Sequence, residues 1–190
     1  MNWLLSLLLL GGCHTATWTA AAPTATPTFH TLTAEHLVEL EYQTANGTTR
    51  QRIRGLIAIL RPDRFRLRVL GPGGIALFDL LSLPEGVHIV QSIRNATDPR
   101  SRELFSSIAE DLRLAYDLRG HAPATTTLEA NRVVARSDSR VVTLGHFVSQ
   151  DSAALFTDLQ IDNRTLHYQV HVKVSNLRVN PPLDPDMFNK

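Results

Sequence analysis

Several common classes of protein are excluded by what this sequence lacks. Cys13 is the only cysteine among 190 residues, which excludes a disulfide framework and a cysteine-rich zinc or iron–sulfur site. Its 19 basic and 18 acidic side chains leave a net charge of +1. Without a basic excess to neutralise phosphates, nucleic acid is not an expected partner. The length suits one domain with a sizeable core.

The N-terminal residues predict a targeting segment. Residues 3–10 read WLLSLLLL, an apolar run that rises only about 12 Å as a helix, whereas a membrane-spanning helix needs roughly 20 apolar residues. The run suits the apolar region of a signal peptide, although Met1 and Asn2 lack the basic charge that normally precedes it.

Cys13 follows this run directly, in the sequence LGGC at 10–13. The pattern resembles the lipobox of bacterial lipoproteins, in which an aliphatic residue and two small residues precede the cysteine. The resemblance implies that residues 1–12 are removed and that acyl chains on Cys13 anchor the protein in a membrane. The other interpretation is a chance cysteine after an ordinary signal peptide. His14 stands where an Asp would retain many lipoproteins in the inner membrane, so the resemblance implies the periplasmic face of a bacterial outer membrane.

Residues 13–28 predict a tether between this anchor and a folded domain. They are rich in Thr, Ala and Pro and show no apolar period, as is typical of extended, weakly structured linkers. Residues 29–190 then form the domain.

A β-hairpin is expected around Asn46-Gly47. This dipeptide is the strongest short hairpin signal, because both central residues of a type I′ turn need a positive φ. With these two residues as the loop, the opposed pairs are Gln43 with Arg50, Glu41 with Arg52, Glu39 with Arg54, and Leu40 with Ile53. One face of the hairpin is then a ladder of opposite charges and the other is apolar, as in a sheet with one solvated face.

The next strand extends the charged face. After a three-residue loop at 61–63, the chain returns as a strand from Phe65 to Val69. Alternation places six arginines on the solvated face: Arg50, Arg52, Arg54, Arg64, Arg66 and Arg68. This stripe could dock lipid phosphates or an acidic partner. The alternative is an ordinary solvated face on which arginine stems cover apolar neighbours.

The segment 75–83 is apolar on both faces and must be covered from both sides. One expected cover is a helix over about 100–118, with Asp98 as N-cap, Pro99 at the first position and Gly120 past the end. Its apolar stripe consists of Leu104, Phe105, Ile108, Leu112, Ala115 and Tyr116. By default this helix faces the core; a movable lid over a cavity is the other interpretation.

The rest of the chain predicts more strands. Alternating runs at 131–136, 140–148, 153–161 and 165–177 follow a polar stretch around 121–127, with a turn at 162–164. Near the C-terminus, Met187 and Phe188 are expected against the sheet edge. The predicted fold class is α+β, with eight to ten antiparallel strands and one main helix inserted midway.

This order of elements resembles the LolA/LolB-like fold of periplasmic carriers and outer-membrane receptors of lipoproteins. The resemblance covers about residues 33–188 and rests on the successive hairpins, the stretch RFRLRVLGPGG at 64–74, the midway helix and the segment 183–188. It implies an antiparallel half-barrel, an incomplete β-barrel, with the helix packed in or over its concave face. An acylated cysteine marks the receptor in this family, so Cys13 favours a LolB-like protein.

The resemblance also implies an apolar cavity that binds acyl chains. The residues expected to line it are Leu40, Ile53, Ile57, Phe65, Leu67, Val69, Leu77, Phe78, Ile108 and Leu112. The cargo would be acyl chains of a lipid or lipoprotein, received from a periplasmic carrier protein. The resemblance implies no cofactor for this role. The alternative is a scaffold lipoprotein with a filled interior that only presents its surface to an assembly partner.

No enzyme motif supports a catalytic role. The fingerprints of hydrolases, zinc proteases, P-loop proteins and dinucleotide-binding enzymes are missing from the sequence, so we expect a protein without enzymatic activity. His167 and His171 share one strand face, but at i, i+4 they lie about 13 Å apart, too far for one metal. His146 and Asp158 could meet across strands, although no nucleophile accompanies them.

Overall fold

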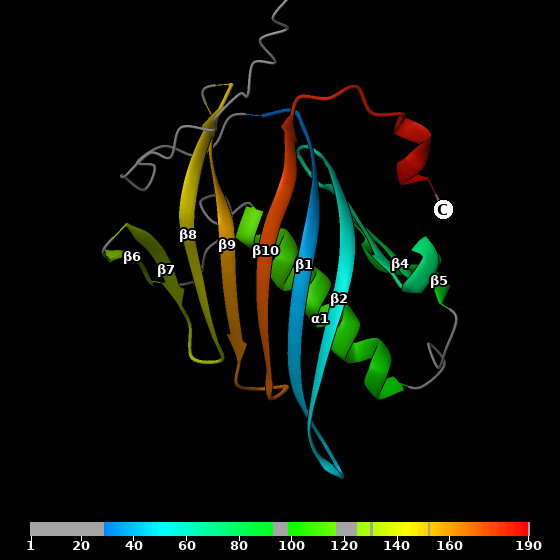
Figure 1. Cartoon of the computed structure of the whole chain (residues 1–190), viewed down its shortest axis with the longest axis vertical. Helices are drawn as coiled ribbons and strands as arrows, with labels where there is room; N and C mark the ends of the chain where they lie inside the picture. The colour runs from blue at the N-terminus through cyan, green and yellow to red at the C-terminus, as the bar shows by residue number, and fades with distance from the viewer. Residues whose placement is uncertain (1–28, 93–98, 117–124, 130, 152, 190) are drawn as a thin grey trace, which may run out of the picture.

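The computed structural model describes residues 29–92, 99–116, 125–129, 131–151 and 153–189. In these residues the chain forms ten antiparallel strands and one α-helix (Figure 1). The strands are β1 (Thr31–Thr44), β2 (Gly47–Leu60), β3 (Arg64–Leu70), β4 (Ala76–Leu83), β5 (Gly86–Ser92), β6 (Thr125–Glu129), β7 (Arg132–Arg136), β8 (Arg140–Gln150), β9 (Ala153–Asn163) and β10 (Tyr168–Val179). The helix is α1 (Pro99–Tyr116), and the short 3₁₀ segments are η1 (Pro72–Gly74) and η2 (Pro185–Phe188).

All ten strands belong to one open sheet. Their order is β5-β4-β3-β2-β1-β10-β9-β8-β7-β6, so the first and last strands pair at its centre. Within the described residues the edge strands β5 and β6 do not pair with each other, and the barrel stays open. The sequence between these two edges contains α1, which therefore crosses the inner face of the sheet (Figure 1). The predicted α+β half-barrel with one main helix is confirmed.

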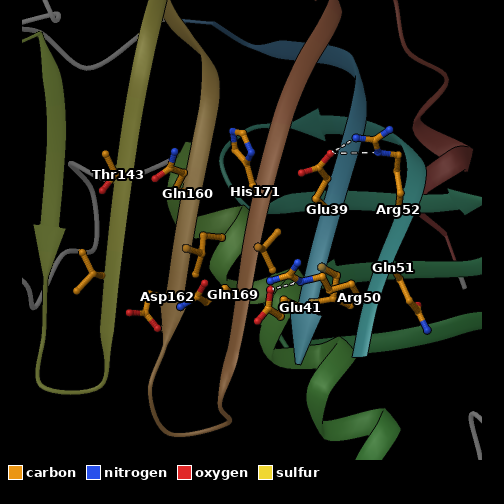
Figure 2. A pocket seen from close by; sticks show the side chains of 14 residues that line it. Glu39, Glu41, Arg50, Gln51, Arg52, Thr143, Gln160, Asp162, Gln169 and His171 are labelled. Carbon is orange, nitrogen blue, oxygen red and sulfur yellow. Dashed lines mark hydrogen bonds and ion pairs between the residues drawn. The ribbon is translucent and has the colours of Figure 1, made fainter. Parts of the chain in front are cut away.

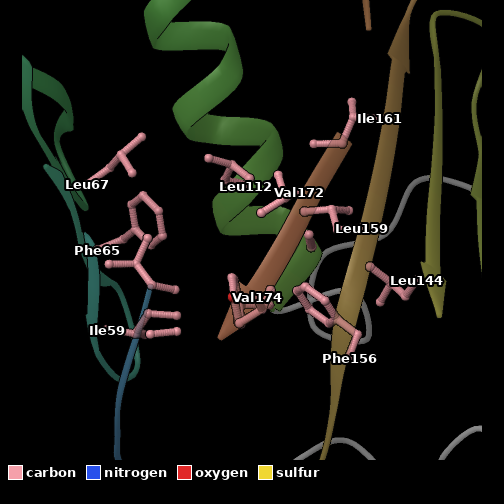
Figure 3. Close-up of a cluster of buried hydrophobic side chains, with 14 of the residues drawn as sticks. Ile59, Phe65, Leu67, Leu112, Leu144, Phe156, Leu159, Ile161, Val172 and Val174 are labelled. Carbon is pink, nitrogen blue, oxygen red and sulfur yellow. The ribbon is translucent and has the colours of Figure 1, made fainter. Parts of the chain in front are cut away.

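One large apolar cluster fills the space between the sheet and α1. Its side chains come from the inward rows of β1 to β4 and β7 to β10, and from the apolar stripe of the helix. Figure 3 shows such side chains converging on α1 from β3 on one side and from β8 and β9 on the other. α1, the one α-helix among the described residues, is too short or too polar to span a membrane.

The β1–β2 hairpin forms with a register different from the predicted one. Thr44 pairs with Gly47, so the loop residues are Ala45 and Asn46. Neither of them has a positive φ, whereas Gly47, which follows them, has a φ of 112°. A type I turn followed by a glycine bulge uses the same Asn-Gly pair as the predicted type I′ turn. The partners shift by two residues: Glu41 faces Arg50, Glu39 faces Arg52 and Leu40 faces Gln51. Because a shift of two keeps each side chain on its face, the charge ladder survives.

Other boundaries are close to the predictions, with two differences. The loop at 61–63 has the predicted three residues, since Leu60 pairs with Arg64. β6 begins within the polar stretch around 121–127, where no alternating run was identified. The turn predicted at 162–164 begins later, because β9 continues through Asn163 and the turn occupies 164–167. The helix begins at Pro99 as predicted, whereas Asp98 and Gly120 lie outside the described residues.

The C-terminal segment packs on the outer face of the sheet, not at its edge as predicted. Phe188 is buried against Ala58 of β2 and Leu81 of β4. Residues that pack around this small cluster are Leu60, Leu83, Leu183 and Met187. The later part of the segment 75–83 is therefore covered on its inner side by α1, over Phe78 and Leu80, and on its outer side by η2, over Leu81, whereas Ile75 and Leu77 at its start stay exposed.

Candidate functional site

The candidate site is the seam, which we define as the contact layer between the apolar stripe of α1 and the inner face of the sheet. Ile108, Leu112, Ala115 and Tyr116 are buried there, while Phe105 is partly buried and lies 4.4 Å from Phe78 between ring centroids. A residual void of about 30 Å³ remains inside the seam. This volume has room for only one or two water molecules, whereas pockets for small molecules usually measure 300 to 1,000 Å³.

Most of the predicted cavity residues line this void. They are Leu40, Ile53, Leu67, Val69, Phe78, Ile108 and Leu112. Ile57 and Phe65 belong to the same buried cluster without bordering the void. Leu77 is not brought to the seam: a bulge lies between the pairs of Val69 and Leu70 with β4, and Leu77 is 36% exposed. Apart from Arg54, the residues that line the void are apolar.

A buried histidine holds the C-terminal end of α1. His36 lies on the inward row of β1, stacks on Tyr116 and places its Nε2 2.8 Å from the Tyr116 hydroxyl. Burial lowers the pKa of His36 to about 3 and raises that of Tyr116. Both groups are therefore neutral near pH 7. Arg61, whose guanidinium lies over Phe29, donates from Nη2 to the carbonyl of Tyr116 at 3.2 Å, which satisfies one of the free carbonyls at the helix end.

A second polar group fixes the middle of α1. Asp111 is 1% exposed and accepts hydrogen bonds at Oδ2 from the hydroxyl of Tyr168 and from Nδ2 of Asn163, the latter at 3.3 Å. Ser107, one turn earlier, lies 3.1 Å from the same hydroxyl. Arg140 Nη1 approaches Asp111 Oδ1 to 2.9 Å, an ion pair by distance without the alignment of a hydrogen bond. Desolvation raises the pKa of Asp111 despite these partners.

Sequence reasoning missed these polar groups, although signals for two of them were present. His36 interrupts a row of apolar residues at alternate positions of β1, and Asp111 precedes Leu112 within the helical stripe. A polar residue on an otherwise apolar face needs a buried partner. Sequence reasoning also missed exposed apolar side chains near one edge of the sheet. Ile75, in the turn between β3 and β4, is 60% exposed, and Val90 on β5 is 44% exposed.

The predicted arginine stripe is largely neutralised on the outer face. Arg50 pairs with Glu41 at 2.7 Å, Arg52 with Glu39, and Arg54 with Glu35 at 3.8 Å. These arginines are 69 to 80% exposed, so each pair contributes little to stability. Figure 2 shows two of these pairs beside a polar trough of about 770 Å³ that reaches across β10 and β9 to Thr143 on β8. The ladder is a solvated face with paired charges.

One carboxylate on the outer face differs from the ladder. Asp79 of β4 is 2% exposed in its side chain and accepts from Arg66 Nη2 at 2.7 Å and from Arg68 Nη2 at 3.0 Å. Arg66 also donates to the carbonyl of Met187 in the C-terminal segment. The hydrogen bonds to Asp79 raise the pKa of Arg66. Two arginines therefore share one buried carboxylate.

The histidine arrangements differ from the predictions: His167 does not share a strand with His171, and the histidine beside Asp158 is His171. Asp158 lies 2.9 Å from Nε2 of His171 on the neighbouring strand. His167 lies in the turn before β10, with a positive φ of 51°. No group of three or more His, Cys, Asp or Glu side chains within the described part of the chain is placed to hold a metal ion.

Comparisons with known proteins find the same fold in solved structures. A LolA superfamily protein, NE2245 from Nitrosomonas europaea, matches with a TM-score of 0.55 and 8% identity, over 84% of this chain and 90% of that one. A DUF1329 family protein from Desulfovibrio piger matches with a TM-score of 0.51 and 9% identity, over 85% and 90% of the two chains. No protein-family model and no curated protein sequence matches this chain. The predicted LolA/LolB-like fold is confirmed.

Proposed function

We propose that this protein takes up acyl chains of a lipid or lipoprotein in the seam, and accepts or transfers them at a bacterial outer membrane. The observation that carries the proposal is the construction of the seam. Among the described residues one amphipathic helix covers the inner face of an open sheet, and the side chains around the void between them are apolar apart from Arg54, with the buried polar contacts of His36 and Asp111 lying elsewhere along the helix. Acylated Cys13 would hold the protein at the periplasmic face of that membrane.

The small void implies that α1 must move to admit an acyl chain. A volume of about 30 Å³ is about a tenth of the smallest usual ligand pocket. Displacing α1 would expose five large side chains: Leu104, Phe105, Ile108, Leu112 and Tyr116. At about 1.5 to 3 kcal/mol for each side chain, this costs about 8 to 15 kcal/mol.

An acyl chain offers a similar free energy in return. A chain with about 15 methylenes gains about 12 kcal/mol on burial, at about 0.8 kcal/mol per methylene. For an acyl chain taken from water, the free energy gained by burying the chain is therefore similar to the cost of exposing the helix side chains. No covalent step is involved, so the proposed role needs neither an enzymatic group nor a cofactor.

The exposed apolar surface beside the seam suggests where a chain would enter. Ile75 lies in the connection from β3 to β4 and Leu77 near the start of β4, next in sequence to Phe78, which lines the void. Val90 adds to this surface from β5. An acyl chain arriving from a membrane or from a periplasmic carrier protein would meet apolar side chains before it reaches the seam.

The filled seam also favours a second candidate, a scaffold lipoprotein whose helix never leaves the sheet. The buried contacts of His36 and Asp111 would then serve only to fix α1. The two candidates differ in whether the purified protein contains or binds acyl chains.

Lipid analysis of the purified protein tests the proposal. We expect stoichiometric acyl lipid by mass spectrometry and binding of a fluorescent fatty acid. Ile108→Glu should abolish this binding, because it places a carboxylate in the seam. Glu110→Gln is the matched control on the exposed side of the same helix and should bind normally. Phe78→Glu should abolish binding under the first candidate and only destabilise the fold under the second. A purified protein that contains no lipid and does not bind the fluorescent fatty acid would instead support the scaffold lipoprotein.

A further inference from the structure

A row of four side chains crosses the outer face near the N-terminal end of β1. Thr33 pairs with Ala58 of β2 on one side and with Arg178 of β10 on the other. Ala58 in turn pairs with Arg66 of β3. Strands lie about 4.8 Å apart, so the two arginines stand roughly 14 Å apart across a floor formed by two small side chains. These residues line a groove of about 530 Å³, which we call the arginine groove.

A β-bulge places Arg178 on this row. Glu35 pairs with Ser175, so regular pairing would set Leu177 opposite Thr33. Instead the register shifts by one residue at Asn176, whose φ is 49°, and Arg178 takes that position. Leu177 packs against the main core as a result. Bulges commonly redirect a side chain in this way.

Positive charge is in excess in the arginine groove. Arg66 and Arg68 share the single carboxylate of Asp79. Arg178 has no hydrogen-bond or ion-pair partner within the described residues. Glu35, the acidic residue of the lining, is paired with Arg54 at 3.8 Å. The three ladder arginines, Arg50, Arg52 and Arg54, each have a glutamate partner, whereas the groove has more cationic than anionic groups.

The groove is prepared for an anion. Arg66 is only 15% exposed and is fixed by Asp79 and by the carbonyl of Met187. Guanidinium groups held in place bind phosphate with little further loss of conformational freedom. The other lining residues include the amide side chain of Asn176 and the apolar Leu56, which is 39% exposed.

The chain enters the domain at this same end of the sheet. Phe29 is the first described residue, and the next backbone N–H, of His30, donates to Asn180 Oδ1 at 2.8 Å. The sixteen residues 13–28, which precede Phe29, can span at most about 55 Å. If Cys13 is acylated, as the proposed function requires, the arginine groove is within reach of lipid headgroups.

We propose that the arginine groove binds the phosphate of an anionic phospholipid headgroup in the membrane that anchors the protein. The cationic walls and the small floor suit a compact phosphate better than the broad, paired surface of the ladder does. Contact at this groove would orient the outer face near the N-terminal end of β1 toward the membrane.

Vesicle co-sedimentation tests this inference. The chain from residue 13 onward with Cys13→Ser keeps every described residue and has no acyl anchor of its own. We expect it to bind phosphatidylcholine vesicles that contain phosphatidylglycerol and not vesicles of phosphatidylcholine alone. Arg178→Gln should weaken binding roughly fivefold, the loss typical of one basic residue at an anionic membrane.

Arg50→Gln is the matched control. It removes one positive charge from the same face, 80% exposed and outside the groove, and should leave vesicle binding unchanged. An equal loss of vesicle binding in both variants would indicate general charge attraction and would overturn the proposal of a specific site in the groove. Equal binding to neutral vesicles, preference for free inorganic phosphate, or preference for an acidic peptide such as polyglutamate would also overturn it.

Fatty-acid uptake without vesicles separates this inference from the proposed function. Arg178→Gln should take up the fluorescent fatty acid normally, because the groove lies on the opposite face of the sheet from the seam. Loss of vesicle binding with normal uptake supports the groove. If the protein takes up no fatty acid but its vesicle binding depends on Arg178, phosphate binding at the groove is supported and the proposed uptake of acyl chains is rejected.

Discussion

The two faces of the sheet use polar side chains in opposite ways. On the inner face His36 and Asp111 are buried and point at groups that fix α1. On the outer face charged residues are numerous, exposed and paired along β1 and β2. Exposed pairs contribute little individually, whereas an unpaired buried group is costly. The inner face can therefore control the position of one helix with few residues, while the outer face keeps the sheet solvated.

The largest effect that we expect is on the inner face and depends on pH. His36 is neutral in the folded protein because its pKa is lowered to about 3 from 6.5, while the unfolded chain binds a proton below about pH 6.5. The contribution of His36 to the free energy of unfolding is therefore complete above pH 6.5. It falls as the pH drops toward 3, by up to about 1.4 kcal/mol per pH unit. Urea denaturation at a series of pH values measures this slope.

His36→Gln is the control for that slope. The variant has no titrating group at this position, so its stability should change less between pH 6.5 and 3. Asp111, whose raised pKa acts in the opposite sense, is common to both proteins and cancels in the difference. Identical slopes for the two proteins would contradict the assignment.

On the outer face the largest effect should come from Asp79. Asp79→Ala leaves the half-buried Arg66 without its carboxylate, and breaking a buried ion pair costs about 3 to 5 kcal/mol. Denaturant unfolding should show this loss. Glu41→Ala, which removes an acid from the exposed ladder, should lower stability by less than about 1 kcal/mol. Equal losses would remove the distinction between Asp79 and the ladder.

A smaller effect is expected from Tyr168→Phe. The change removes the hydroxyl that donates to Asp111 and leaves Asn163 and Arg140 as partners of that carboxylate. Loss of one hydrogen bond to a buried group costs about 1 to 3 kcal/mol. The substitution should increase the rate of hydrogen exchange more in α1 than in the central strands. Uptake of a fluorescent fatty acid should also become faster. Uniformly faster exchange across the sheet would indicate a general loss of stability instead.

The smallest effect is expected for Arg52→Ala in the ladder. The side chain is 69% exposed and pairs with Glu39, whose pKa is lowered chiefly by the hydrogen bond from Arg52. Unfolding free energy should change by less than about 1 kcal/mol. A nuclear magnetic resonance titration should show the pKa of Glu39 rising in the variant; an unchanged pKa would contradict the pairing.

The faces of the strands could be predicted better than their partners. Alternation alone placed Phe65, Leu67 and the arginines of β2 and β3 on the correct faces. The β1–β2 register could not be fixed, because Asn46-Gly47 suits two kinds of turn that differ by two residues in pairing. Either turn leaves the charged and apolar faces intact, so the error does not alter the side chains at the seam.

Contacts between distant segments were beyond the sequence patterns. Nothing in the alternation of β4 indicates that Leu81 meets Phe188, more than a hundred residues later. The bulge that exposes Leu77 and the bulge that exposes Arg178 break the same alternation on which the predictions depended. Most of the predicted cavity residues do lie at the seam, but its filled state depends on side-chain packing that periodicity does not encode.

A distance measurement between α1 and the sheet shows whether the helix moves when an acyl chain binds. Spin labels at Glu110→Cys on α1 and Thr143→Cys on β8, in a Cys13→Ser background, report the separation of helix and sheet. We expect this distance to lengthen when a fatty acid binds and to return to its starting value when the fatty acid is removed. Bound fatty acid with an unchanged distance would contradict this movement of the helix.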